Sequence, residues 1–146
     1  MTDLTAQISN FSQTLELCSK EILVQLAQQS SWDSRYRTIM LLGKKLPNLN
    51  QEMKSDSALV QGCESNVWLH FQWHNNHLQL AASSDAKIVK GLIAIVLAAY
   101  NNKTREEILS FDIEGYFQQL QLSKNLSPSR TNGLFSIVKT IQAAAR

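Results

Sequence analysis

The apolar residues near the start of the chain recur every three or four positions, which is the spacing of one face of an amphipathic helix. They form one stripe that comprises Leu4, Ile8, Phe11, Leu15, Cys18, Ile22 and Leu26. The pattern predicts a single N-terminal helix within residues 1–30, with Cys18 buried on its apolar face. A second helix is predicted to begin at Ser31 and to end before Pro47, because a proline disfavours helical angles in the preceding residue.

A different period follows the polar segment of residues 48–57, which we predict to be a loop. Between residues 67 and 74 apolar and polar side chains alternate, as in a strand with at least one covered face. Asn75 and Asn76 can turn the chain because asparagine tolerates positive φ, and residues 78–82 alternate on the way back. The sequence therefore predicts an antiparallel hairpin.

Helices are predicted for the rest of the chain. Ser84 can cap a helix whose apolar side chains cover most of its circumference, so this helix is expected at the centre of the fold. Thr104 and Glu107 have the spacing of a capping box, and another helix is expected around residues 116–120. The Ser-Pro pair at residues 127–128 can begin a C-terminal helix. Helices, a hairpin and further helices in this order predict an α+β fold, with a small antiparallel sheet packed with several helices.

Length and composition agree with one soluble domain of residues 1–146. No apolar run reaches the about 18 residues of a membrane span. The N-terminus lacks the basic and apolar segments of a secretory signal, so we expect a cytoplasmic protein in which Cys18 and Cys63 are free thiols. The net charge of +2 comes from interspersed residues of both signs. We therefore expect neither a membrane nor a nucleic acid as partner.

One of the two cysteines, Cys63, lies between Gly62 and Glu64 in the stretch LVQGCESNVWL. The glycine relaxes the backbone beside the thiol, and the junction between a loop and a strand favours exposure. The adjacent Glu64 carboxylate opposes formation of a thiolate. Local features leave two interpretations open, an accessible nucleophile or a small buried residue at a strand end.

Other polar residues carry less information alone. His70, His74 and His77 cluster at the hairpin, but a closed zinc site needs about four well-placed ligands, so we predict no metal. Asp85 is explained as a favourable charge at a helix N-terminus, and Arg130 as a solvated surface cation. The five glycines form no phosphate-binding loop or dinucleotide fingerprint.

Four stretches taken together resemble the SufE family of sulfur-acceptor proteins, which includes the CsdE branch. They are WDSRYRTIMLLGKKLP, LVQGCESNVWL, SSDAKIVKGLIAIVLAAY and LSPSRTNGL, and they occur in the family's order. The resemblance begins at Trp32 and leaves about the first thirty residues outside a core of residues 31–146. It implies a compact α+β domain like that of NifU-type scaffold proteins.

The resemblance also implies an activity. Members of the family take sulfane sulfur from a pyridoxal-phosphate cysteine desulfurase of the SufS or CsdA kind, stimulate that enzyme, and relay the persulfide toward iron–sulfur cluster assembly. The matching cysteine is Cys63. By motif position Arg130 matches a family arginine near the cysteine region and Asp85 an acid of the stretch DSDA, so these two residues, with Gly62 and Glu64, are expected to support the loop or the docking surface. Arg130 is further expected to favour the thiolate.

On this reading the protein is a sulfur-transfer partner of a desulfurase rather than a stand-alone enzyme. It binds no cofactor directly, and the pyridoxal phosphate belongs to the desulfurase. A downstream acceptor or iron–sulfur scaffold receives the sulfur, and a homodimer remains open. Two alternatives are a non-catalytic adaptor that activates the desulfurase by docking alone, and CsdE-like delivery to an adenylating or tRNA-modifying enzyme. A scaffold that holds a cluster itself is disfavoured, because cluster ligation usually requires about four thiolates.

Overall fold

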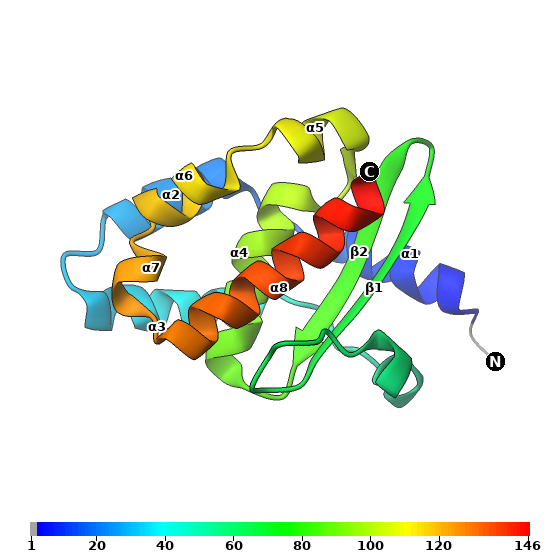
Figure 1. The fold of residues 1–146 in the computed structure, drawn as a ribbon, viewed down its shortest axis with the longest axis horizontal. Coiled ribbons are helices and arrows are strands. Elements are labelled where there is room, and N and C mark those ends of the chain that lie inside the picture. Colours follow the sequence, from blue (N-terminus) through cyan, green and yellow to red (C-terminus); the bar gives the residue numbers. More distant parts are fainter. Residues whose placement is uncertain (1–2) are drawn as a thin grey trace.

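The computed structural model describes residues 3–146, so the first two residues of the predicted domain lie outside the described part. Helices pack against a small antiparallel sheet of strand order β1-β2-β3, which lies toward one side of the molecule (Figure 1). The predicted α+β class is confirmed. The elements are α1 (Leu4–Thr14), α2 (Ser19–Ala27), α3 (Trp32–Gly43), the 3-10 turns η1 (Gln51–Met53) and η2 (Asp56–Ala58), β1 (Val67–His74), β2 (His77–Ser84), α4 (Lys87–Tyr100), β3 (Lys103–Thr104), α5 (Arg105–Ser110), α6 (Ile113–Gln119), α7 (Leu122–Asn125) and α8 (Pro128–Ala145).

The predicted hairpin is present. Asn75 and Asn76 have φ values of 51° and 65°, which allow a tight two-residue connection between β1 and β2. The strands pair from His74 with His77 to Val67 with Ser84. The two-residue strand β3, which pairs with the start of β2, was not predicted because so short a segment has no detectable alternation.

Strand β2 is covered on both of its faces. All residues from Leu78 to Ser84 are buried, and successive side chains of a strand point to opposite sides. Helix α1 covers one face, where Gln79 Nε2 donates to Ser9 Oγ at 3.4 Å and Gln72 Nε2 donates to the Thr5 carbonyl at 3.0 Å. Helix α4 also contacts β2. Strand β2 therefore lies between helices, whereas the edge strand β1 is exposed along its second half.

The prediction of one N-terminal helix is wrong, because the chain forms α1 and α2 with an extended break between them. Leu15 leaves the helix with ψ 114°, and Cys18 is the extended N-cap residue of α2. Asn101 fixes the break, since its Nδ2 donates to the Ser12 carbonyl at 3.0 Å while Ser12 Oγ donates to its Oδ1 at 2.7 Å. Helix α1 then packs on β2 and α2 packs on α4, which one straight helix could not do.

The helix caps are mostly as predicted. The capping box of Thr104 and Glu107 is formed, and Ser127 caps α8 with Pro128 at its start. The cap predicted for Ser84 is wrong, because the strand pairing continues to this residue and the N-cap of α4 is Ala86. Helix α4 is nevertheless the predicted central helix, with eleven of its fourteen residues buried. No helix in residues 3–146 is long and apolar enough to cross a membrane.

Helices α3 and α4 approach closely at two glycines. A Cβ atom built on Gly91 would lie 2.2 Å from the Ile39 carbonyl oxygen, and one built on Gly43 would lie 2.7 Å from the Gly91 backbone nitrogen. Both distances are shorter than any van der Waals contact. The absence of side chains at these positions therefore sets the separation of the two helices.

We expect Gly91→Ala to lower the free energy of unfolding by about 1–3 kcal/mol, because the added methyl group overpacks the crossing. A glycine inside a helix is normally worse than alanine by about 1 kcal/mol, so the sign is opposite to that of helix propensity. Gly133→Ala in α8 is the matched control, since its Cβ would have its nearest neighbour at 3.5 Å. Urea denaturation of both variants tests this, and a Gly91→Ala protein as stable as the control would contradict it.

Candidate functional site

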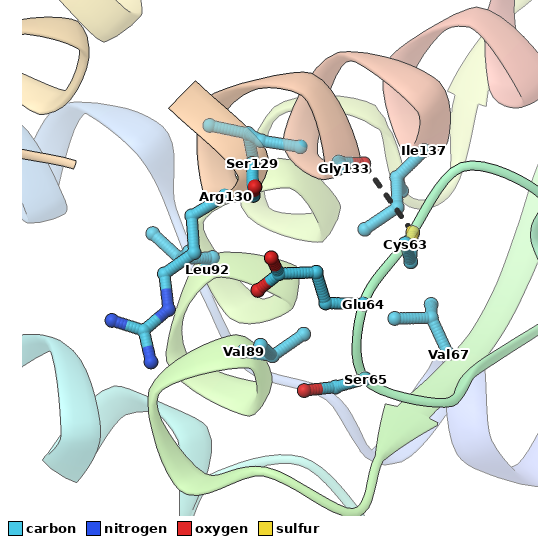
Figure 2. Close-up of a pocket in the computed structure, with 11 residues that line it drawn as sticks. Cys63, Glu64, Ser65, Val67, Val89, Leu92, Ser129, Arg130, Gly133 and Ile137 are labelled. Atoms are coloured by element: carbon cyan, nitrogen blue, oxygen red, sulfur yellow. Dashed lines mark hydrogen bonds between the residues drawn. The ribbon is translucent and has the colours of Figure 1, made fainter. Parts of the chain in front are cut away.

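Cys63 lies in the loop that connects η2 to β1. The loop is tied at its base, where the Val60 N–H donates to the Val67 carbonyl at 2.9 Å and Leu59 forms an isolated bridge with Trp68. Gly62 has a φ of +90°, a conformation that other residues rarely adopt. This turn brings Cys63 against α8, as Figure 2 shows.

Small residues allow the loop to approach α8 closely. The Cys63 thiol donates to the Gly133 carbonyl, with the sulfur 3.6 Å from the oxygen. A Cβ on Gly62 would lie 2.8 Å from Ser136 Oγ. Because one weak S–H donor provides the hydrogen bond, the thiol is held mainly by contact with the helix.

A cavity of about 50 Å³ opens beside the Cys63 thiol. One water-sized atom needs about 10–15 Å³ of such space, so the cavity has room for an additional sulfur atom. Its walls are largely apolar and come from the Cys63 loop, β1, α4 and α8. They comprise Cys63, Glu64, Ser65, Val67, Val89, Leu92, Ser129, Arg130, Gly133, Leu134 and Ile137.

Burial raises the pKa of the Cys63 thiol above its ordinary value. The cause is desolvation, which disfavours the charged thiolate more than the neutral thiol. While the loop lies against α8, Cys63 is therefore less ionised near neutral pH than an exposed cysteine would be. Movement of the loop into water would remove this effect and increase the nucleophilic fraction.

Glu64 and Arg130 line the same cavity but are exposed on its rim. Figure 2 shows the Arg130 side chain extending away from Cys63, with the Glu64 side chain between them. Arg130 lies in the first turn of α8, where the Ser127 hydroxyl accepts its backbone N–H at 3.2 Å. The expected effect of Arg130 on the thiolate stays a prediction, as does the opposing effect of Glu64.

Asp85 does not line the cavity, but its carboxylate is hydrogen-bonded to the Cys63 loop, which forms one wall of the cavity. Its Oδ2 accepts a hydrogen bond from Asn66 Nδ2 at 3.2 Å. The neighbouring Ser84 Oγ donates to the Asn66 carbonyl at 2.6 Å. The end of the Cys63 loop is thus attached to the chain just before α4 by both the backbone and the side chain of Asn66.

Sequence reasoning missed several residues of the site. Asn66 had no signal, because its partners are almost twenty positions away. Gly133, Ser136 and Ile137 lie within the predicted C-terminal helix, and the glycine in the stretch SRTNG is the one sequence signal of a close approach there. These contacts depend on the tertiary packing of α8.

The second cysteine does not have the environment predicted for it. Cys18 is exposed at the start of α2, because the break after α1 moves it off the apolar stripe. Both cysteines have free thiols, and Cys18 is not part of the lining of the Cys63 cavity.

The hairpin histidines hydrogen-bond to nearby protein groups. His70 Nε2 lies 2.7 Å from the Met53 carbonyl oxygen, and His77 Nδ1 lies 2.8 Å from the Asn75 carbonyl oxygen. Within residues 3–146, no group of three or more His, Cys, Asp or Glu side chains is arranged to hold a metal ion.

Two comparisons with known proteins bear on the fold and the family. The family model for SufE, described as an Fe-S metabolism associated domain, matches residues 20–145. The match includes all of α2 except its first residue, whereas the sequence resemblance leaves this helix outside the core. The solution structure of a hypothetical protein from Thermus thermophilus is similar with a TM-score of 0.70 and 18% identity, covering 88% of this chain and 93% of that one. At this identity the second comparison supports the fold alone.

We expect iodoacetamide to modify Cys18 several-fold faster than Cys63 in the folded protein near pH 8. Cys18 is exposed, whereas the Cys63 thiol is half-buried and its pKa is raised by burial. The pH profile of Cys63 should lie at higher pH in the folded chain than in urea, where the two rates should converge. Peptide mass spectrometry separates the two sites, and faster modification of Cys63 in the native state would contradict this description.

Proposed function

This chain belongs to the SufE family, which is associated with Fe–S metabolism, and we propose that Cys63 is the residue on which it carries sulfur. The donor in this proposal is a cysteine desulfurase, whose pyridoxal phosphate releases sulfur from free cysteine. The recipient is a protein of iron–sulfur cluster assembly. The chain acts with the desulfurase and needs no cofactor of its own.

The observation that carries the proposal is the position of Cys63 in a loop that closes over an apolar cavity. A sulfur carrier has two opposed requirements, since its thiol must reach a partner while its persulfide must be kept from water and other thiols. The cavity of about 50 Å³ beside the thiol accommodates the added sulfur in the closed loop. The glycine at φ +90° and the single S–H hydrogen bond suit a loop that can leave α8.

The transfer is an exchange at sulfur that needs no outside oxidant or reductant. The Cys63 thiolate attacks the terminal sulfur of the desulfurase persulfide, and a new S–S bond forms on Cys63. The S–S bond of the donor breaks, and its cysteine leaves as a thiolate. The proton lost from the Cys63 thiol balances the proton that the donor thiolate takes up. The same exchange in the next step delivers the sulfur to the acceptor.

The raised pKa of Cys63 fits this sequence of events. In the closed loop the thiol is largely protonated and therefore a poor nucleophile. Docking of a desulfurase would draw the Cys63 loop away from α8. The Cys63 thiol would then lie in more polar surroundings, beside the persulfide-bearing cysteine of the desulfurase, and would ionise more readily. The reactive thiolate would then exist mainly in the complex, which limits its reaction with disulfides and other electrophiles outside the complex.

The face that docks on the desulfurase includes the Cys63 loop and the first turns of α4 and α8. Two thiols must touch for sulfur to pass, so Cys63 lies inside the interface and its flanking elements share it. Asp85 and Arg130 place opposite charges on this face. Such charges influence the rate and specificity of association more than the final affinity.

We expect Cys63→Ser to abolish transfer of sulfur to the chain, and Cys18→Ser to leave it within about twofold of wild type. The protein is incubated with a cysteine desulfurase and cysteine, and the added sulfur is located by mass spectrometry without reductant. Sulfur on the Cys63→Ser protein at normal yield would refute the assignment. If Cys63→Ser still stimulates the desulfurase fully while accepting nothing, the chain is an adaptor that acts by docking.

We expect Asp85→Arg to change the affinity for the desulfurase by about fivefold, equivalent to roughly 1 kcal/mol for one hydrogen bond and its charge. The variant removes the acceptor of Asn66 Nδ2 and reverses a charge on the docking face. The change should be larger at low salt, because salt screens exposed charges. Asp85→Asn is the matched control, since it keeps an acceptor oxygen. Equal affinities for wild type and Asp85→Arg at both salt concentrations would place the docking face elsewhere.

A further inference from the structure

A second surface next to the Cys63 site has a distinct chemical character. It is a cleft of about 460 Å³ between the second half of α3 and the start of α4, which we call the basic cleft. Its lining includes the cations Arg37, Lys44, Lys87 and Lys90 beside the apolar side chains of Met40 and Leu41. No Asp or Glu is among its lining residues.

The four cations of the basic cleft are not neutralised within the described part of the chain. In residues 3–146, none of the four forms an ion pair or a side-chain hydrogen bond. Three of them are exposed, and Lys90 is half-buried. Like charges that share a cleft repel one another, so an anion placed among them would be attracted by all four.

Helix stability does not explain the two lysines on α4. Lys87 is the first residue of the helix and Lys90 lies in its first turn, which contains no acid. Cations at this end of a helix are disfavoured by the backbone dipoles. The pair is therefore expected to serve binding rather than folding.

The mixed lining favours a protein segment over a nucleic acid. Leu41 is 53% exposed, and it lies beside the cations, so the lining presents an apolar side chain together with the charges. Aromatic side chains for base stacking are not among the lining residues, and the whole chain has a net charge of only +2. A segment that carries both acidic and apolar side chains would satisfy both parts of the lining.

The basic cleft is close enough to Cys63 for one partner to reach both. On α4, Lys87 and Lys90 point to one side, while Val89 and Leu92, which line the Cys63 cavity, point to the other. The two sites are thus separated by the width of one helix, about 10 Å. A typical interface covers about 800 Å² on each partner, a patch about 30 Å across. In Figure 1 the first turn of α4 is at the lower end of that helix, near the start of α8.

We propose that the basic cleft binds an acidic segment of the cysteine desulfurase that loads Cys63, and this inference rests on the proposed function. The desulfurase would contact both sides of the first turn of α4, with its persulfide at Cys63 and its acidic segment between α3 and α4. The cleft would then orient the chain before the loop opens.

The test compares two double variants with the same change of formal charge. Lys87→Glu/Lys90→Glu reverses both cations of α4 in the cleft, and acids in the first turn of a helix favour folding. Lys20→Glu/Lys139→Glu is the matched control, because both lysines are exposed and neither lines the cleft or the Cys63 cavity. Affinity for the desulfurase is measured by titration at low and high salt, and sulfur on Cys63 is measured in parallel. Unfolding curves verify that all proteins are folded.

We expect the cleft variant to bind the desulfurase at least about tenfold more weakly at low salt, with a smaller loss at high salt. The affinity of the control variant for the desulfurase should change by less than about threefold, as expected from the change in total charge alone. Equal losses in the two variants, or no loss in the cleft variant, would overturn the proposal. So would a cleft variant that binds the desulfurase normally but loses affinity for bulk tRNA or inorganic phosphate. A wild-type chain that never receives sulfur on Cys63 would instead refute the proposed function.

Discussion

The close packing of α4 at the centre of the molecule is the constraint on which the rest of the structure depends. The apolar side chains of α4 pack into the core beneath the sheet. On another side, α4 contacts α3 at Gly43 and Gly91, where there is no room for a methyl group. Helix α8 lies on a third side. Because α4 is held in this way, the first turn of α4 has a fixed position, and both the Cys63 cavity and the basic cleft are built against it.

At Cys63 the structure balances burial against access. Desolvation raises the pKa of the thiol, and the cavity provides a largely apolar space beside the sulfur. Against this, the loop is held to α8 by few polar contacts, and its attachment to the start of α4 runs through Asn66. A deeply buried cysteine would be shielded but could not meet a partner, whereas a persulfide on an exposed cysteine, such as Cys18, could be attacked by any free thiol. An intermediate position on a loop meets both needs of a carrier.

The outcome of the sequence predictions follows the range of the interactions involved. Local patterns predicted the hairpin, the capping box, the start of α8 and the buried character of α4, because each depends on residues a few positions apart. The predictions were wrong where an interaction with a distant residue overrides the local pattern. The apolar stripe predicted one N-terminal helix, but Asn101 ends α1 by bonding to Ser12. Ser84 has the sequence features of a cap, but pairing with Val67 keeps it in the strand.

The sequence by itself determined the α+β class and, through four motifs, the family and Cys63 as the candidate residue. These properties depend on periodicity and on short motifs, which can be recognised in the sequence before the packing is known. Only the tertiary structure decided what surrounds the thiol, since Gly133 and Ser136 are some seventy residues from the loop. It also decided that Cys18 is exposed and that lysines from α4 meet Arg37 of α3 and its C-cap residue Lys44 in one cleft. Proximity between residues far apart in the chain arises from the packing of whole helices, which no local pattern encodes.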